Sequence, residues 1–414
     1  MTAPSSSCIL WQNDDKTTIL LDLPRSIEEA QLPSKEEFFK DVSPGNESRP
    51  RRLISAAPPD GPFPTPDPKL GCRSQPVAST ASQSAQLAEL MTLAAAESAL
   101  DKINWSYQGP WCLPRVTSKP ITPTEKQPVF HSDENSGSTN STTESENTIA
   151  VSTPSGDPGL TTESSPSSSQ PSSSPYYMPP DSHPLLGSIA SLRSRFLSPP
   201  TPKFNLILLD PPWPNRSAKR KRRGADSYTP VDSLTSIHSL LSLIPIASSL
   251  LPDGMVAVWI TNTPKFHDLL TSTLFKEWDV ELVGEWVWLK VTTKGEPIVS
   301  FESEWRRPWE RLVLGRKRGG MKSGAVRGKV LVGVPDFHSR KPNLRSVFEE
   351  EGLAEKGYKG LEVFARNLTA GWWGWGDEVL KFQGREWWVE EGEEVSEENV
   401  EGQLERNQGN EEAN

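Results

Sequence analysis

Residues 205–213 read Asn-Leu-Ile-Leu-Leu-Asp-Pro-Pro-Trp, and the fold is organised around this stretch. An unbroken apolar run that ends in a carboxylate and two prolines is typical of a buried parallel strand. The carboxyl ends of such strands open into the crevice in which α/β sheets bind ligands. Because the prolines fix φ and donate no hydrogen bond, we expect the chain to leave the sheet as a stiff loop with free carbonyls.

The groups at the end of this strand suit one flat ligand. Asp210 and the carbonyl of Pro211 are two acceptors that can take both hydrogens of an exocyclic amino group, while the indole of Trp213 stacks on the ring. Adenine carries such an amino group on a flat ring. A lone Asp210 would more often cap the end of a strand, but the prolines and Trp213 beside it favour a ligand site.

Two blocks of sequence together resemble one family of enzymes. Residues 210–213 (Asp-Pro-Pro-Trp) are similar to the signature of the S-adenosylmethionine-dependent adenine-N6 methyltransferases, the MT-A family. Residues 361–367 (Leu-Glu-Val-Phe-Ala-Arg-Asn) and 376–383 (Gly-Asp-Glu-Val-Leu-Lys-Phe-Gln) resemble its methyltransferase-like four branch. The tetrapeptide alone is moderately specific, whereas the blocks in this order and at this distance are a strong signal.

The resemblance covers roughly residues 176–382 and implies both an activity and a fold. The implied activity is transfer of a methyl group from S-adenosylmethionine to the N6 amino group of adenine, in RNA such as small nuclear RNA or in DNA. The implied fold is a permuted class I methyltransferase, with the catalytic strand early in the chain and the cofactor-binding strand late.

Periodicity supports an α/β fold by itself. Apolar runs of strand length alternate with amphipathic runs of helix length, which predicts a Rossmann-like, mostly parallel twisted sheet with helices on both faces. The expected strands are residues 205–209, 255–260, 280–291, 311–314, 329–334 and 360–365. The expected helices are residues 189–196, 235–250, 264–276 and 344–350.

Composition divides the rest of the chain. Only 34% of its residues are hydrophobic and 39 are proline, so long segments are expected to lack a packed core. We predict a partly ordered, family-specific N-terminal region, a disordered linker rich in Ser, Thr and Pro, the methyltransferase domain and a disordered acidic tail. In that order these are residues 1–130, 131–175, 176–389 and 390–414.

Within the N-terminal region, residues 9–11 and 18–21 predict a hairpin, and the proline-rich residues 44–76 a linker. Residues 83–103 predict a helix with apolar side chains near helical spacing, namely Leu87, Leu90, Met91, Ala94 and Leu100. Packing of this helix on the main domain is favoured over docking to a specific partner. The aromatic residues that follow are expected to anchor the segment, namely Trp105, Tyr107 and Trp111.

Charge and cysteine content bound the function only loosely. The net charge is −10, but residues 390–414 hold ten Glu and one Arg, which leaves −10 − (−9) = −1 for the rest. The acidic total therefore does not argue against a nucleic-acid partner. Cys8, Cys72 and Cys112 show no metal-ligand spacing and fit a reducing compartment. No apolar run approaches the ~18 residues that span a bilayer, so we expect no membrane partner. Because the cysteines lack metal-ligand spacing, we expect no metal partner either.

The resemblance also implies a set of cofactor contacts. Lys341, in the basic loop 339–342, matches the lysine that meets the methionine carboxylate, and Arg366 and Asn367 match residues assigned to the ribose. The other implied contacts are Ser188, Ile189, Asp210, Glu362, Asp377 and Glu378. The family carries Asp where this chain has Ser188. It carries Asn where this chain has Asp377, whose carboxylate can accept from ribose hydroxyls but lacks the amide donor, so weaker cofactor binding is expected from this residue. Considered alone, Glu362 is more often a structural salt-bridge partner.

Cationic segments predict the substrate surface. Residues 214–224 follow the catalytic motif directly, which favours contact with a polyanion or nuclear localisation equally, and either one over a merely solvated loop. Candidate substrate residues there are Asn215, Lys219 and Arg220. The resemblance implies that Tyr228 lies beside the substrate, and the alternative is a packing role. Arg306 and Arg307 are expected to meet phosphates or to form a salt bridge within their loop. We expect a nuclear protein that also occurs in the cytoplasm.

The predicted chemistry is one of orientation. Asp210 and the Pro211 carbonyl accept the two amino hydrogens, Pro212 stiffens the corner and Trp213 stacks on the base, so that the nitrogen lone pair faces the methyl group. The target adenine must be unpaired or flipped. We expect the protein to act as a monomer. Two rivals are a non-catalytic nucleic-acid-binding partner subunit with the same fold, and a methyltransferase for proteins or small molecules.

Overall fold

The computed structural model describes residues 7–33, 51–64, 83–117, 175–200, 202–214, 233–303, 306–352 and 358–390. All of these residues fall in one compact unit. Except for residues 175 and 390, the predicted linker and the predicted acidic tail lie outside the described residues, so their disorder stays a prediction.

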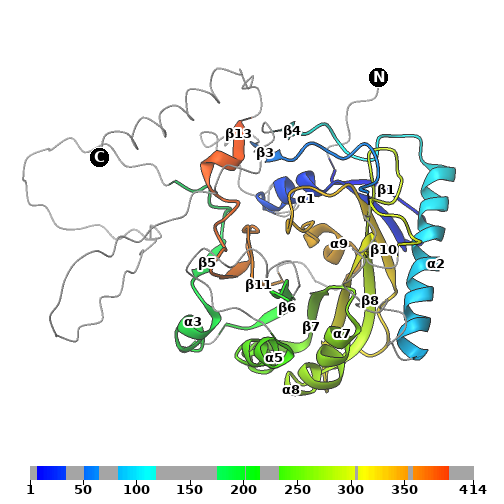
Figure 1. The fold of residues 1–414 in the computed structure, drawn as a ribbon. Helices are drawn as coiled ribbons and strands as arrows, with labels where there is room; N and C mark the ends of the chain where they lie inside the picture. The colour runs from blue at the N-terminus through cyan, green and yellow to red at the C-terminus, as the bar shows by residue number, and fades with distance from the viewer. Residues whose placement is uncertain are drawn as a thin grey trace, which may run out of the picture. The chain divides into compact units, whose positions relative to one another are not determined.

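A ten-stranded sheet forms the centre of the molecule, in the order β1-β2-β10-β8-β9-β7-β6-β11-β12-β5 (Figure 1). Its strands are β1 (Ile9–Gln12), β2 (Thr18–Leu21), β5 (His183–Leu186), β6 (Phe204–Leu209), β7 (Leu250–Ile260), β8 (Val280–Lys290), β9 (Trp309–Lys317), β10 (Lys329–Gly333), β11 (Gly360–Val363) and β12 (Trp373–Gly376). A smaller sheet, in the order β13-β3-β4, joins β3 (Arg51–Ser55), β4 (Val116–Thr117) and β13 (Trp388–Glu390).

Most neighbouring strands of the large sheet are parallel. Only the pairs β1–β2, β7–β9 and β8–β9 are antiparallel, so β1 and β9 run against the other eight strands. The predicted mostly parallel α/β sheet is therefore confirmed. Because β9 runs in the opposite direction, it begins at the edge where β6, β7, β8, β10 and β11 end.

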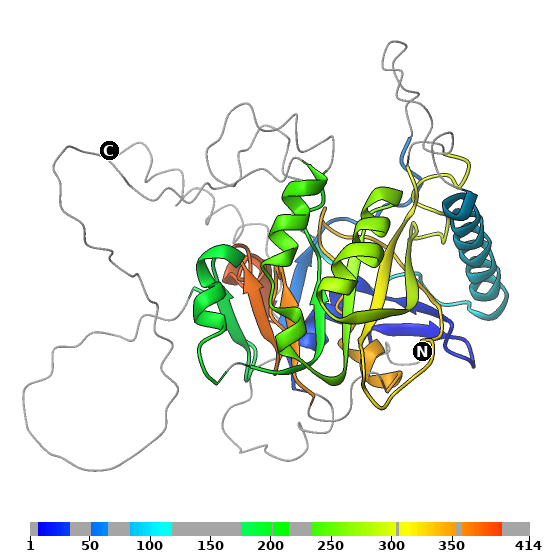
Figure 2. The ribbon, with the colours of Figure 1, turned by 90° about the horizontal axis from the view of Figure 1, so that it is seen from below.

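Helices cover both faces of this sheet. They are α1 (Leu23–Ala30), α2 (Gln83–Ser106), α3 (Ile189–Phe196), α5 (Leu234–Ser242), α6 (Ile246–Ser249), α7 (Pro264–Leu269), a π-helical stretch η2 (Leu270–Leu274), α8 (Phe275–Glu277), α9 (Arg345–Glu350) and a 3₁₀ turn η3 (Arg385–Trp387). In Figure 1, α1 and α9 lie on one side of the sheet, whereas α3, α5, α7 and α8 lie on the other. Figure 2 shows α2 and α3 at opposite ends of the sheet.

Side-chain alternation along β6 explains this layering. Ile207 and Leu209 belong to the core cluster shared with α3, α5 and α7, whereas Leu206 and Leu208 point to the cluster shared with α1 and α9. A strand with apolar residues on both faces is stable only between two helical layers. Each fully buried side chain of this kind contributes about 2 kcal/mol. The core thus holds the carboxyl end of β6, and with it Asp210, in place.

Several local predictions need correction. The helix predicted at 235–250 is broken into α5 and α6, because Pro245 lacks the N–H that a continuous helix requires. The proline-rich stretch 44–76, predicted to be a linker, contains β3, which pairs with β13 and β4. The predicted hairpin is present as β1 and β2, but β2 also pairs with β10 and so becomes part of the main sheet.

The predicted packing of helix α2 on the sheet is confirmed, but of the five expected apolar residues only Leu100 is buried. Its buried residues include Ala96, Ala99 and Ile103, whereas Leu87 and Met91 are 59% and 66% exposed. Small alanine side chains allow a helix to approach a sheet closely, so Ala96 and Ala99 form the contact together with Leu100 and Ile103. The residue predicted to anchor the following segment, Trp105, is 89% exposed, while Tyr107 and Trp111 do pack on the core.

None of the helices in the described part of the chain has the length and hydrophobicity to cross a membrane.

Candidate active site

The ends of three strands and the start of a fourth bring distant parts of the sequence together at one edge of the sheet. Asp210 follows β6, the loop 334–341 follows β10, residues 364–367 follow β11, and the first residues of β9 reach the same edge because that strand is antiparallel. A cavity opens here, in accordance with the rule that α/β sheets bind ligands at this edge. It is lined by Leu208, Asp210, Trp259, Ser339, Arg340, Lys341, Pro342, Asn343, Glu362, Phe364, Arg366, Asn367 and Phe382.

Asp210 is held in the cavity between two cations. Its Oδ1 lies 3.3 Å from Nζ of Lys341, and its Oδ2 accepts a hydrogen bond of 3.0 Å from Nη1 of Arg366. The Asp210 side chain is 15% exposed, so these are partly buried ion pairs. Such pairs contribute more than pairs on the surface, where solvent screens the charges.

The ion pairs continue on both sides of Asp210. Nζ of Lys341 also lies 2.9 Å from Glu310, which pairs in addition with Lys290. On the other side, Nε of Arg366 donates to Glu378 at 3.0 Å. Burial alone would lower the pKa of Lys341, but the charges of Asp210 and Glu310 raise it above its usual value. Lys341 therefore stays positively charged at neutral pH, as a contact for an anionic group requires.

Two glutamates at this edge differ in protonation state. Burial would raise the pKa of Glu310, but Lys341 and Lys290 lower it to about 2. Burial and the neighbouring charge of Asp210 raise the pKa of Glu362 to about 8, against the opposing effect of Arg366. Glu310 is therefore ionised at neutral pH, whereas Glu362 is mostly protonated and able to donate a hydrogen bond.

Two residues with left-handed backbone conformation border the cavity. Ser339 has φ of 73° and Phe364 has φ of 62°, a region that bulky residues other than glycine rarely adopt. Each such residue costs about 1 kcal/mol or more and persists only when its surroundings hold it. Phe364 is held by its N–H, which donates to the carbonyl of Trp375. This strain directs Arg366 and Asn367 toward the cavity instead of continuing β11.

Trp213 lies elsewhere than the sequence predicted. Its indole is 7% exposed, stacks on Phe266 of α7 with ring centroids 4.9 Å apart, and donates from Nε1 to the carbonyl of Trp259 at 2.7 Å. It does not line the cavity. A large apolar ring contributes more by packing in the core, with its N–H satisfied, than by facing an open crevice. In this position, Trp213 does not present its indole face to a base in the cavity, as the sequence had predicted.

The proline corner is also less open than predicted. The carbonyl of Pro211 accepts a hydrogen bond of 2.8 Å from the N–H of Trp213, so it is not free but keeps one lone pair for another donor. Pro211 is buried and Pro212 half-buried. The tight turn between Pro211 and Trp213 fixes the direction in which the chain leaves Asp210.

The structure brings together only part of the predicted cofactor set. Lys341, Glu362, Arg366 and Asn367 line the cavity with Asp210. Glu378 reaches it through its ion pair with Arg366, while Asp377 is exposed at the end of β12. The last two predicted contacts, Ser188 and Ile189, lie at the end of the neighbouring strand β5. There Ser188 caps α3 and the Ile189 side chain is 3% exposed in the core.

The structure describes only two of the six predicted substrate residues. Arg307 forms a salt bridge, but its partner is Glu89 of α2 and not a residue of its own loop, and Arg306 is exposed. Asn215, Lys219, Arg220 and Tyr228 lie outside the described residues, so their roles stay predictions.

Sequence reasoning missed several residues of this site. The sequence pattern did not single out Glu310, Trp259, Phe364 or Asn343. The available signal for Glu310 was a carboxylate at the start of an apolar strand, which is informative only if the strand is known to be antiparallel. No group of three or more His, Cys, Asp or Glu side chains that could hold a metal ion occurs within the described ranges.

Comparison with known proteins extends the likeness beyond the motif. Residues 204–378 match the MT-A70 family model. The chain is 46% identical over 384 residues to the N6-methyladenosine RNA methyltransferase MTA1 of Cryphonectria parasitica, an alignment that covers 92% of this chain and 94% of that relative. It is 41% identical to the protein of the same name in Pyricularia oryzae, over 93% of this chain and 97% of the relative.

A more distant relative aligns over a shorter part. The N(6)-adenine-specific methyltransferase METTL4 of Mus musculus is 35% identical over 225 residues, which is 52% of this chain and 45% of that protein. The family match includes β6, the loop after β10 and β11, the elements that form the cavity. Given this match and relatives aligned along nearly their whole length, the chain belongs to the MT-A70 family.

Proposed function

We propose that this protein transfers a methyl group from S-adenosylmethionine to the N6 amino group of adenine in nucleic acid. The observation that carries the proposal is Asp210, an acceptor-only carboxylate held at the end of β6 between Lys341 and Arg366 in a cavity. RNA is the first substrate to test, because the relatives aligned over most of their length are named RNA methyltransferases.

The residues of the cavity fit the proposed cofactor. Lys341 offers a cation for a carboxylate, while Arg366 and Asn367 offer donors for ribose hydroxyls, and Phe364 and Phe382 give the cavity apolar walls. Nε and Nη2 of Arg340 are buried and have no hydrogen-bond partner among the described residues, so the polar capacity of the site is not exhausted. When bound, S-adenosylmethionine supplies the methyl group on an electrophilic sulfonium.

The protein's own contribution is orientation and charge. Asp210 would accept one amino hydrogen and the remaining lone pair of Pro211 the other, which aims the nitrogen lone pair away from both acceptors. The negative charge of Asp210 stabilises the positive charge that develops on that nitrogen. Asp210 need not remove a proton, because the methylated ammonium product is acidic enough to lose it to water.

Asp210 has lone pairs beyond those that Lys341 and Arg366 occupy, so it can accept an amino hydrogen with both cations beside it or after either has shifted. Lys341 retains Glu310 and Arg366 retains Glu378 when either turns away from Asp210. Each cation therefore has a second acid that keeps it charged and in place. This arrangement allows Asp210 to change partners without leaving a buried charge unpaired.

The remaining features of the proposal concern the target. The adenine must be unpaired or flipped to reach the sheet edge. The protein is proposed to act as a monomer. The cationic residues 219–223 are proposed to contact phosphates or to direct the protein to the nucleus.

The test is radiolabelled methyl transfer to RNA, DNA and protein side by side, with the full-length protein and its Asp210→Asn variant. We expect label in N6-methyladenine of nucleic acid, lost in the variant by a factor of about 10² or more. Asp268→Asn, which changes an exposed carboxylate on α7, is the matched control and should leave transfer unchanged. Label in protein alone, or equal transfer by the Asp210→Asn variant, would contradict the proposal.

A further inference from the structure

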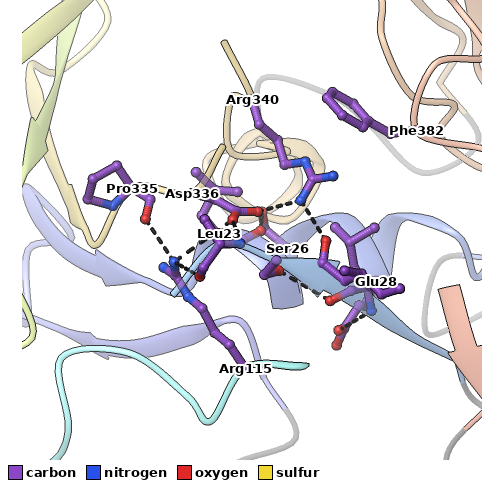
Figure 3. A network of polar contacts seen from close by, with 12 residues as sticks. Leu23, Ser26, Glu28, Arg115, Pro335, Asp336, Arg340 and Phe382 are labelled. Atoms are coloured by element: carbon purple, nitrogen blue, oxygen red, sulfur yellow. Dashed lines mark hydrogen bonds and ion pairs between the residues drawn. The ribbon is translucent and has the colours of Figure 1, made fainter. Parts of the chain in front are cut away.

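A buried polar network ties the N-terminal part of the chain to the loop that carries Lys341 (Figure 3). Arg115, just before β4, donates from Nη1 to the carbonyl of Pro335 at 2.8 Å and from Nη2 to the carbonyl of Val334 at 2.9 Å. Nη1 also donates to the carbonyl of Ala56, at 3.2 Å, after β3. The Arg115 side chain is 2% exposed, so all these bonds are made away from water.

Asp336 is the centre of this network. Its carboxylate accepts from the N–H of Ala56 at 2.6 Å and from Nη1 of Arg340 at 2.5 Å, and it lies 3.9 Å from Arg115. Arg340 lines the cavity, donates to the carbonyl of Ile54 in β3, and lies 4.1 Å over the ring of Phe382. Two guanidinium groups thus share one buried carboxylate, and each loses a partner if another member is removed.

The loop held by this network has a conformation that needs support. Ser339, between Asp336 and Lys341, has φ of 73°, which a serine adopts only when its surroundings impose it. Its carbonyl accepts from Nη1 of Arg366 at 3.2 Å, so the loop is fixed on its cavity side as well. Asp336 and Arg340 pair across the turn as residues i and i+4. Lys341 is the next residue, and its position follows from this turn.

We propose that Arg115 is a positioning residue of the cofactor site. It holds the turn 334–340, through two backbone carbonyls and Asp336, so that Lys341 points at the cavity. It does not line the cavity and lies outside the residues 204–378 that match the family model. The N-terminal region thereby acquires a role that its composition did not indicate. This inference rests on the proposed function, because it concerns binding of the proposed cofactor.

Arg345 serves as a matched control for the possibility that Arg115 only stabilises the fold. Arg345 on α9 donates from Nη1 and Nη2 to the carbonyls of Leu32 and Glu29, near α1, at 2.8 Å each. It therefore ties the N-terminal part to the same domain by bonds of the same kind, and its side chain is absent from the cavity lining. Both replacements should lower the melting temperature. Only replacement of Arg115 should change the cofactor site.

The experiment measures S-adenosylmethionine binding by calorimetry for the full-length protein and for Arg115→Lys, Arg115→Ala and Arg345→Ala. At a temperature where all are folded, we expect Kd to rise about tenfold for Arg115→Ala and less for Arg115→Lys, and to stay within about twofold for Arg345→Ala. In methyl-transfer assays, KM for the cofactor should rise while kcat at saturation changes little. Equal Kd values for the unaltered protein and a folded Arg115→Ala would overturn the inference.

Hydrogen exchange keeps the inference testable if Arg115→Ala does not fold. In Arg115→Lys, amides of the loop 334–341 should exchange faster, while those of the central strand β7 stay unchanged. Unchanged exchange of the loop in this variant would overturn the inference. If the unaltered protein does not bind S-adenosylmethionine, the proposed function fails and this inference with it. If it binds and the Arg115 variants bind equally well, only this inference fails.

Discussion

The two sides of Asp210 each hold a glutamate, and the two glutamates differ in protonation state. Glu310, at the start of β9, faces Lys341 and Lys290, which hold its pKa at about 2. Glu362, on β11, is enclosed beside Asp210, and burial together with that negative charge raises its pKa to about 8. Both carboxyls are partly buried at the same sheet edge, so burial alone does not decide their charge. The charge of the nearest neighbours does.

This difference assigns the two sides different tasks. The Glu310 side is an ionic framework that keeps Lys341 charged and aimed at the cavity. The Glu362 side presents a neutral carboxylic acid, which both donates and accepts hydrogen bonds and so suits sugar hydroxyls. Asp210 lies between the two sides and contributes to both, as a partner of Lys341 and as the charge that keeps Glu362 protonated.

The largest expected effect comes from Asp210→Asn, which removes the charge that acts on both Lys341 and Glu362. Turnover should fall by about 10² or more, since a neutral amide offers less stabilisation of developing positive charge. The same change should lower the pKa of Glu362, because the repelling charge is gone, and leave Glu310 ionised. Carboxyl titration by NMR of selectively labelled glutamate checks this. A Glu362 pKa that stays at about 8 would show that Asp210 does not set it.

Glu310→Gln should remove the ion pairs that Glu310 forms with Lys341 and Lys290. It leaves Lys341 and Lys290 without their shared carboxylate, which we expect to lower the free energy of unfolding by about 2 kcal/mol and to weaken cofactor binding. Denaturant unfolding and calorimetry measure the two effects. Glu281→Gln, an exposed position on β8, is the control and should change neither. A Glu310→Gln protein as stable as the control would contradict the ionic framework.

The pH dependence of stability should have opposite signs for the two glutamates. The folded pKa of Glu310 lies below its unfolded value of about 4.5, so its contribution is present above pH ~4.5 and is lost as pH falls toward 2. The folded pKa of Glu362 lies above 4.5, so the protein loses stability as pH rises from ~4.5 toward 8.

Glu362→Gln sharpens this contrast. The variant lacks the loss above pH ~4.5 and should gain stability relative to the unaltered protein by up to about 4 kcal/mol at pH 8, with no gain at pH 4. Unfolding in denaturant at a series of pH values measures the gain. A difference that does not vary with pH would mean that Glu362 is ionised in the folded protein.

The smallest effect is expected from Trp213→Phe, outside both sides of the cavity. The phenyl ring can still stack on Phe266, but the hydrogen bond to the carbonyl of Trp259 is lost, at about 1 kcal/mol. Thermal unfolding measures this loss, and turnover should fall only modestly. A loss of turnover as large as that of Asp210→Asn, at unchanged stability, would instead restore the predicted stacking of Trp213 on the base.

The sequence predicted β6, the position of Asp210 and the parallel sheet because apolar runs and their turn residues are local signals. It failed where the outcome depends on distant partners. Whether Trp213 faces the crevice or the core is decided by Phe266 and the Trp259 carbonyl, which lie about 50 residues away. The role of Glu310 depends on the direction of β9, and that of Arg115 on a loop that follows β10. Neither the direction of β9 nor the contact of Arg115 with that loop leaves a periodic pattern in the sequence.

The pairing of β2 with β10 also constrains how the protein is made. Thr18 lies opposite Val330, so the ribosome adds some 300 residues before the two strands can meet. Until then β2 has only β1 beside it. A chain shortened to start at residue 176 would leave the apolar β10, with its Val330-Leu331-Val332, as an uncovered sheet edge, a template for aggregation. The first strands of the chain therefore protect solubility, and the enzyme should be produced with them.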